Sequence, residues 1–113
     1  MAIDAVLPLE VTAAAQQLGE NLRLARVRRQ MTQEELAQAC GITRKTLYAL
    51  EKGSPGASIT TTLMVLWKLG LLGSVGAVAH PDADEHGRIL EAARRPKRVR
   101  RPRIDRNNVD NDF

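Results

Sequence analysis

The chain has 113 residues, of which 43% are hydrophobic and 3% aromatic, and its formal net charge is +4. This length predicts one small domain with flexible ends, and a core with so few aromatic rings is marginal in size, which favours an oligomer. The single cysteine excludes an internal disulfide and predicts a reducing, cytoplasmic environment. No run approaches the roughly 18 apolar residues of a membrane helix, and no signal-peptide pattern opens the chain, so we expect neither.

Charge is divided unevenly along the chain. Residues 1–93 carry nine Lys or Arg and ten Asp or Glu, a net charge of −1, whereas residues 94–113 carry eight and three, a net charge of +5. The basic excess therefore describes the C-terminal segment and not the body of the protein. A positive surface on the body must come from local clustering of cations.

The N-terminal part predicts an arm followed by a helix. Residues 1–11 are apolar but interrupted by Pro8, and we expect a flexible arm there. Thr12 can begin a helix that runs to about Arg29. Its core side would carry Leu18, Leu22 and Ala25. The predicted domain spans residues 12–79, and residues 80–113 form a linker and a basic tail.

Residues 32–53, TQEELAQACGITRKTLYALEKG, predict two short helices joined at one glycine. Thr32 and Glu35 have the spacing of a capping box, which would start the first helix. Gly41 suits a turn with positive φ, and Thr43 can cap the second helix. This layout is typical of a helix-turn-helix that reads the DNA major groove, although an ordinary helical hairpin in a bundle shares it.

The apolar positions agree with this layout. Ala37 is small where the two helices would cross closely, and Leu47 and Leu50 are three residues apart, so they share one helix face. That face can pack on Leu36 and Cys40, which predicts a packed thiol and not a reactive one. Arg44 and Lys45 lie in the first turn of the second helix. Cations at a helix N-terminus are unfavourable because of the helix dipole. Binding to a DNA groove lined by phosphates would explain why two cations lie there.

These residues resemble the helix-turn-helix of the Cro/C1-type (XRE) repressors. The resemblance covers roughly residues 15–72 and implies an all-α, five-helix, lambda-repressor-like fold, followed here by a disordered basic tail. The matching motifs are Thr32-Gln33, Leu36-Ala37, Gly41-Ile42-Thr43 and Glu51-Lys52-Gly53.

The resemblance also implies roles for single residues. Gln33 would touch a DNA phosphate and brace the recognition helix, and Arg44 and Lys45 would face base edges, where guanine is the preferred partner. Arg26 and Glu51 would form a structural ion pair. The expected DNA-binding residues are Gln33, Thr43, Arg44, Lys45, Thr46, Tyr48, Ala49 and Lys52. Of these, Ala49 could offer only an apolar contact to a thymine methyl group.

Two further helices are predicted after the Gly/Pro-rich loop of residues 53–58. Ser58 can cap the first of them, whose apolar side would carry Leu63, Leu66, Trp67 and Leu69. The second is expected over residues 71–79, and its apolar side chains must be buried, either in the monomer core or in a two-fold dimer interface, which we favour. The residues in question are Leu71, Leu72, Val75 and Val78.

The C-terminal part raises the question of a partner. Residues 82–93 predict a short helix, and the arginine-rich segment after it has too little apolar content to fold alone. This tail could make nonspecific nucleic-acid contacts or grip a protein. The residues expected to do so are Arg98, Arg100, Arg101, Arg103 and Phe113.

An XRE domain with a C-terminal extension resembles the HipB-type antitoxins. That resemblance implies a homodimer in a bacterial cytoplasm that associates with the nucleoid when it binds palindromic operator DNA. It would repress its own operon and sequester a HipA-like kinase toxin. The tail of this chain is longer and richer in arginine than the short extension of that family.

Two other functions fit the pattern. One is a stand-alone XRE-family repressor without a dedicated protein partner, and the other is an RNA-binding adaptor that uses the tail. The adaptor ranks last because the chain lacks stacking aromatics. With no nucleophile–base set and no phosphate-binding glycine loop, we expect no enzyme and no cofactor. His80 and His86, with acidic residues between them, predict a solvated loop and not a metal site.

Overall fold

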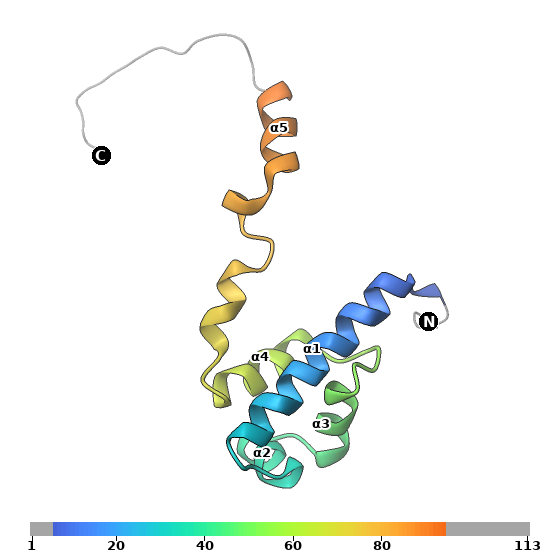
Figure 1. The fold of residues 1–113 in the computed structure, drawn as a ribbon, viewed down its shortest axis with the longest axis vertical. Helices are drawn as coiled ribbons and strands as arrows, with labels where there is room; N and C mark the ends of the chain where they lie inside the picture. Colours follow the sequence, from blue (N-terminus) through green and yellow to red (C-terminus); the bar gives the residue numbers. More distant parts are fainter. Residues whose placement is uncertain (1–5, 95–113) are drawn as a thin grey trace, which may run out of the picture. The chain divides into compact units, whose positions relative to one another are not determined.

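The computed structural model describes residues 6–94, and all regular structure in that range is helical (Figure 1). The all-α expectation is therefore confirmed. The chain divides into two units, Met1–Gly76 and Ala77–Phe113. The helices of the first unit are α1 (Leu9–Arg28), α2 (Gln33–Cys40), α3 (Arg44–Glu51), α4 (Ile59–Lys68) and the 3-10 helix η2 (Leu72–Ala77), which ends one residue past the boundary. The second unit contains the short 3-10 helix η3 (Pro81–Ala83) and α5 (Glu85–Arg94).

The helix starts follow from the capping residues that the sequence predicts. Thr32 Oγ1 accepts a hydrogen bond from the backbone N–H of Glu35 at 3.0 Å, and the Glu35 carboxylate accepts one from the N–H of Thr32 at 2.9 Å. Thr43 and Ser58 cap α3 and α4 with their side-chain oxygens, which accept hydrogen bonds from the N–H groups of Thr46 and Thr61. Gly41 ends α2 with φ at 72°, a left-handed conformation that costs little only without a Cβ.

The first helix begins earlier than the sequence predicted. It starts at Leu9 and not at Thr12, because Pro8 serves as the N-cap. The Pro8 carbonyl accepts hydrogen bonds from the N–H groups of Val11 at 3.0 Å and Thr12 at 3.2 Å. Proline is tolerated at this position because its fixed φ suits a helix start and the missing N–H would have no partner inside the helix. Residues 9–11 therefore belong to the helix and not to an arm.

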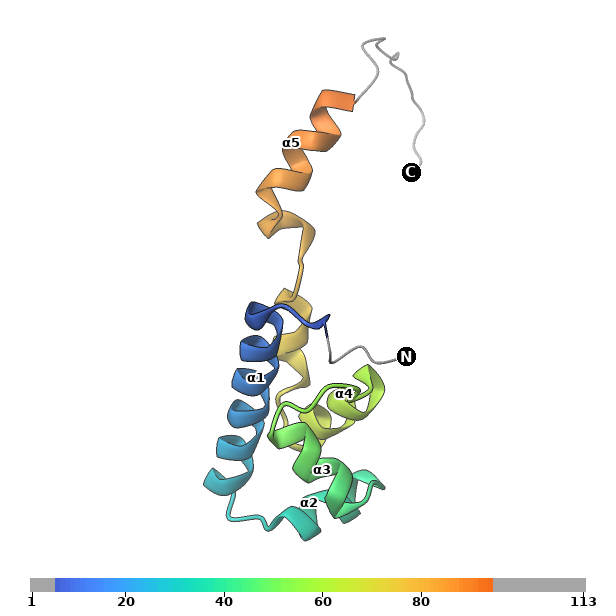
Figure 2. The same cartoon turned by 90° about the vertical axis from the view of Figure 1, so that its right-hand side faces the viewer.

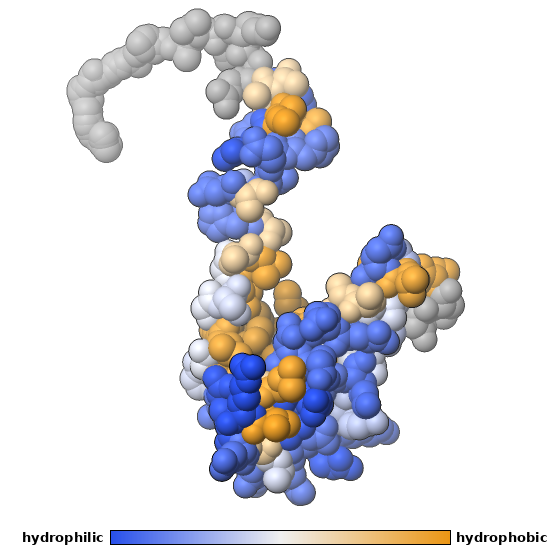
Figure 3. Space-filling model, in the orientation of Figure 1, coloured by the Kyte–Doolittle hydropathy of each residue, from blue (hydrophilic) through white to orange (hydrophobic). Residues whose placement is uncertain are grey.

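The core of the first unit lies among α1, α2, α3 and α4. Leu22, Leu36, Leu47 and Val65 are completely buried, one from each helix. Trp67, which was expected on the apolar side of α4, is instead 57% exposed, and Leu18 of α1 is also exposed. Leu18 lines an open apolar depression together with Leu50 and Gly53, which leaves it 42% exposed. The N-terminal turns of α1 reach beyond the other helices (Figures 1 and 2). Figure 3 shows apolar surface at that end of α1, where Leu9 and Val11 are exposed.

A glycine that the sequence analysis passed over sets the crossing of α1 and α3. A Cβ added to Gly19 would lie 2.5 Å from the carbonyl oxygen of Glu51 and 2.6 Å from that of Leu50. These distances are far shorter than real Cβ contacts, so any side chain at Gly19 would push the two helices apart. Gly19 thereby lets the C-terminal end of α3 lie directly against α1.

Residues 71–79 do not form the expected α-helix. They contain the 3-10 helix Leu72–Ala77, since Gly73 and Gly76 each disfavour an α-helix by about 1 kcal/mol. Leu71 and Val75 pack partly against the core, but Leu72 is 39% and Val78 is 72% exposed. Complete burial of this segment in the monomer core, one of the two alternatives, is therefore wrong.

The second unit is small and carries no buried residue among those described. The predicted helix over residues 82–93 is present as α5, shifted three residues along the chain at its start. Its apolar residues Ile89 and Leu90 are exposed. His80 caps η3, since its Nδ1 accepts a hydrogen bond from the N–H of Asp82 at 3.1 Å. Within residues 6–94, no helix has the length and apolarity required to cross a membrane.

Candidate nucleic-acid interface

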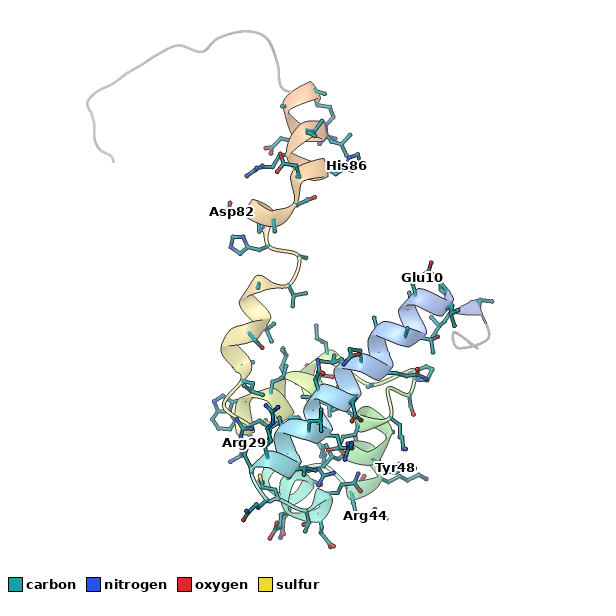
Figure 4. All side chains as sticks on the ribbon, viewed as in Figure 1. Glu10, Arg29, Arg44, Tyr48, Asp82 and His86 are labelled. Carbon is teal, nitrogen blue, oxygen red and sulfur yellow. The ribbon has the colours of Figure 1, made fainter. Side chains whose placement is uncertain are left out.

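Helix α3 separates a buried face from a polar, exposed face. Leu47, Leu50 and Glu51 are buried against the other helices. The opposite face carries exposed side chains that include two cations in the first turn and a third after the last turn. The exposed side chains are Arg44, Lys45, Thr46, Tyr48 and Lys52, and Ala49 beside them is half-buried. Figure 4 shows Arg44 and Tyr48 projecting from α3 into solvent.

A buried ion pair holds α3 against α1. Arg26 Nε donates to Glu51 Oε2 at 2.7 Å, and its Nη2 donates to Glu51 Oε1 at 3.1 Å. The two residues are only 9% and 5% exposed, and Arg26 Nη1 also donates to the carbonyl of Met31 at 2.8 Å. Planar, two-point pairing of this kind fixes orientation as well as distance. Arg26 and Glu51 thus occupy the position and geometry of the predicted structural pair.

Gln33 connects this ion pair to the exposed face of α3. Its Nε2 donates to Glu51 Oε1 at 3.0 Å, and its Oε1 accepts from Arg44 Nη1 at 3.2 Å. A continuous hydrogen-bonded chain therefore runs from buried Arg26 through Glu51 and Gln33 to exposed Arg44. Because Arg26 and Glu51 are fixed by burial, this series of hydrogen bonds restricts where the Arg44 guanidinium can lie.

Thr43 and Thr46, two of the expected DNA-binding residues, form hydrogen bonds with each other at the start of α3. Thr43 caps α3, and its hydroxyl also donates to the Thr46 hydroxyl at 2.9 Å. Lys45, in contrast, makes no ion pair within residues 6–94. The first turn of α3 therefore offers one braced cation, Arg44, and one unpaired cation, Lys45.

Two depressions flank the exposed face of α3. The larger, of about 420 Å³, lies between Lys45, Thr46 and Ala49 on one side and the loop of residues 54–58 on the other. The smaller, of about 170 Å³, is lined by Glu20, Arg23, Gln33, Tyr48, Glu51 and Lys52. Sequence reasoning missed Glu20 and Arg23, although their spacing of three residues on a predicted helix already indicated an exposed pair.

The structure tests neither the predicted dimer interface nor the predicted role of the tail. Leu71, Leu72, Val75 and Val78 lie at or near the surface, as described above, and the described structure contains one copy of the chain. Arg98, Arg100, Arg101, Arg103 and Phe113 lie outside the described residues. Both assignments stay predictions.

Cys40 contributes to packing. It is buried, and its Sγ lies 3.9 Å from the carbonyl oxygen of Met64. Burial raises the pKa of the Cys40 thiol, with a smaller opposing effect from Lys68. A neutral, buried thiol is a poor nucleophile. Among residues 6–94, no cluster of three or more His, Cys, Asp or Glu could hold a metal ion.

Comparison with known proteins supports the interpretation of this surface. Residues 17–66 match a family model described as a helix-turn-helix domain. The match covers less than half of the chain and supports a helix-turn-helix domain over this segment. Its matched range takes in α2 and α3, most of α1 and most of α4. No curated protein matches the chain, and no solved structure matches it.

A helix-turn-helix domain indicates DNA binding, and it identifies the polar face of α3 as the candidate DNA-contacting surface. In such domains the second helix of the motif lies in the major groove, and its N-terminal residues contact base edges. In this protein that helix is α3, and the residues of its first turn are Arg44, Lys45 and Thr46.

Proposed function

We propose that this protein is a transcriptional repressor that binds double-stranded DNA at specific sequences through α3. The observation that carries the proposal is the hydrogen-bonded chain from the buried Arg26–Glu51 pair through Gln33 to Arg44. A recognition arginine gains specificity from a restricted position, because a two-point contact to guanine O6 and N7 tolerates little misplacement. A cation serving only bulk attraction to phosphates would need no such brace.

The remaining exposed residues fit the same task. Lys45 is free of ion pairs among the described residues and can reach a second base edge or a phosphate. Gln33, at the start of α2, uses one N–H of its amide group on Glu51, and the second N–H can donate to a phosphate while the bond to Arg44 stays in place. Ala49 presents only a methyl group, which suits contact with a thymine methyl. Tyr48 lies about one turn beyond Arg44 and Lys52 about two turns beyond it, and both can contact the DNA backbone.

We further propose that the repressor binds DNA as a homodimer. Leu72 and Val78 are exposed in the single chain, and burying such side chains is favourable by roughly 25 cal/mol per Å² of apolar area. Two copies joined through this segment would present two α3 helices to one duplex. Dimers of helix-turn-helix proteins read half-sites about 34–36 Å apart, and the operator is then palindromic.

The finer proposal is that the repressor is an autoregulating antitoxin of the HipB type, whose partner is a HipA-like kinase. It rests on the resemblance of the domain and on the charge of the tail, which carries a net +5 while the body is nearly neutral. A domain that already has its own recognition helix has no need of those cations to read bases. The alternative is a repressor with no dedicated protein partner.

Selection from a random duplex pool tests the DNA-binding proposal. The full chain should enrich one sequence family, and a dimer should enrich two half-sites related by two-fold symmetry, with centres roughly 10 base pairs apart. Enrichment of a single half-site would contradict the dimer. Binding with no sequence preference would contradict a sequence-specific repressor.

A further inference from the structure

The smaller depression beside α3 is a polar recess built from three helices. Its lining comes from one turn of α1, the first residue of α2 and the C-terminal half of α3. Glu51 is one of its two carboxylates, but Arg26 and Gln33 already occupy both oxygens of that group. The charges of the recess that face solvent are therefore those of Glu20, Arg23 and Lys52.

Glu20 is engaged by one of these cations and close to the other. Arg23 donates from Nε and Nη2 to the two oxygens of Glu20, at 3.0 and 2.8 Å. These hydrogen bonds, helped by the positive charges of Arg23 and Lys52, hold the pKa of Glu20 below its ordinary value. Glu20 is therefore ionised at neutral pH, where it forms a partly exposed ion pair.

Lys52 has no carboxylate partner within residues 6–94. Its Nζ lies over the Tyr48 ring, 5.5 Å from the ring centre. Since Arg26 balances the charge of Glu51, the recess holds two further cations, Arg23 and Lys52, and only one further carboxylate, Glu20. This excess of positive charge lies beside the face of α3 that would enter the major groove, where the nearest solvent-side anions are backbone phosphates.

We propose that this recess binds one phosphate of the DNA backbone through Arg23 and Lys52, and that Glu20 competes with that phosphate for Arg23. The proposal rests on the proposed function. The guanidinium that now holds Glu20 at two points can hold two phosphate oxygens in the same way. Because exposed ion pairs are weak, the exchange costs little. Glu20 then lowers the affinity for every DNA sequence, so that tight binding depends on the base contacts of α3.

The test compares two charge-matched variants of the full chain. Glu20→Gln should bind both the selected duplex and a shuffled duplex of the same composition about two- to fivefold more tightly at low salt. The gain should shrink as salt screens the charges. Glu10→Gln makes the same change in net charge ten residues earlier on α1, roughly 15 Å away along the helix, and should have little effect (Figure 4).

A second pair of variants asks whether the effect passes through Arg23. Arg23→Gln should reduce the slope of log K against log salt by about 0.9, the value for one phosphate contact. When Arg23 is already replaced by Gln, the substitution Glu20→Gln should increase the affinity for DNA less than it does in the otherwise unaltered chain. An equal gain with and without Arg23, or a gain no larger than that of Glu10→Gln, would overturn the inference. Circular dichroism checks that each variant is folded.

The same measurements separate this inference from the proposed function. If the unaltered chain prefers its selected duplex but Glu20→Gln behaves as Glu10→Gln does, the repressor proposal stands and the competition by Glu20 is wrong. If the unaltered chain binds neither duplex, both proposals are wrong.

Discussion

Under the proposed function, Arg44 is the residue on which specificity for one DNA sequence would most depend. It is exposed, yet its guanidinium is tied through Gln33 and Glu51 to a buried arginine. The resemblance to the XRE repressors implied that Arg44 would face DNA and that Arg26 would pair with Glu51. It could not indicate that Gln33 joins the two, because that link requires α2 and α3 to meet at a particular angle.

Replacing Arg44 by alanine should weaken binding to the selected duplex by about 1–3 kcal/mol and relax the preference at one base pair. The physical reason is the loss of a positioned two-point contact. Affinities for the selected duplex and its single-base variants, measured by fluorescence anisotropy, check the expectation. Arg88→Ala, which removes an exposed arginine from α5, is the control. An equal loss on shuffled DNA would make Arg44 a phosphate contact instead.

At the scale of elements, α1 acts as the support for α3. The close crossing at Gly19 brings the backbone of α3 onto α1, and the Arg26–Glu51 pair fixes it there. The periodicity of α1 predicted which side would face the core. It did not predict how far α1 would extend beyond the helices that pack against it. Its start also depended on Pro8, which a pattern-based reading treats as a breaker although it fits a helix N-cap.

Gly19→Ala should destabilise the fold by about 1–3 kcal/mol, since the added Cβ meets the carbonyl oxygens of Leu50 and Glu51. The helix propensity of alanine offsets only part of that cost. Gly73→Ala is the matched control, because a Cβ there meets nothing within 4 Å. Urea unfolding followed by circular dichroism measures both variants. A Gly19→Ala protein as stable as the unaltered chain would show that the crossing is not tight.

At the scale of the whole molecule, the proposed function assigns recognition of the DNA sequence to the helix-turn-helix domain and electrostatic attraction to the C-terminal segment. The helix-turn-helix domain holds few net charges, and the excess of cations lies after residue 93. Residues 95–113 lie outside the described structure, so their part in the proposed function rests on composition. The same division would let a partner engage the tail while the domain holds DNA.

Deleting residues 94–113 should reduce the salt dependence of DNA binding and leave the preference for the selected sequence intact. Cations that contact phosphates without reading bases contribute to that slope and not to specificity. Anisotropy titrations at several salt concentrations measure it. If the antitoxin proposal holds, the deletion should also abolish co-purification of a HipA-like kinase expressed with the chain. Loss of all sequence preference on deletion would place recognition in the tail.

The sequence by itself determined the helix-turn-helix, its capping residues and the residues of its exposed helix, because each depends on contacts between residues close in the chain. Capping at Thr32 and the turn at Gly41 are of this kind. Only the tertiary structure decided that Gln33 hydrogen-bonds to Arg44, that Gly19 permits the α1–α3 crossing, and that Glu20 and Arg23 border the exposed face of α3. These contacts join residues far apart in sequence, and their geometry follows from how the helices pack.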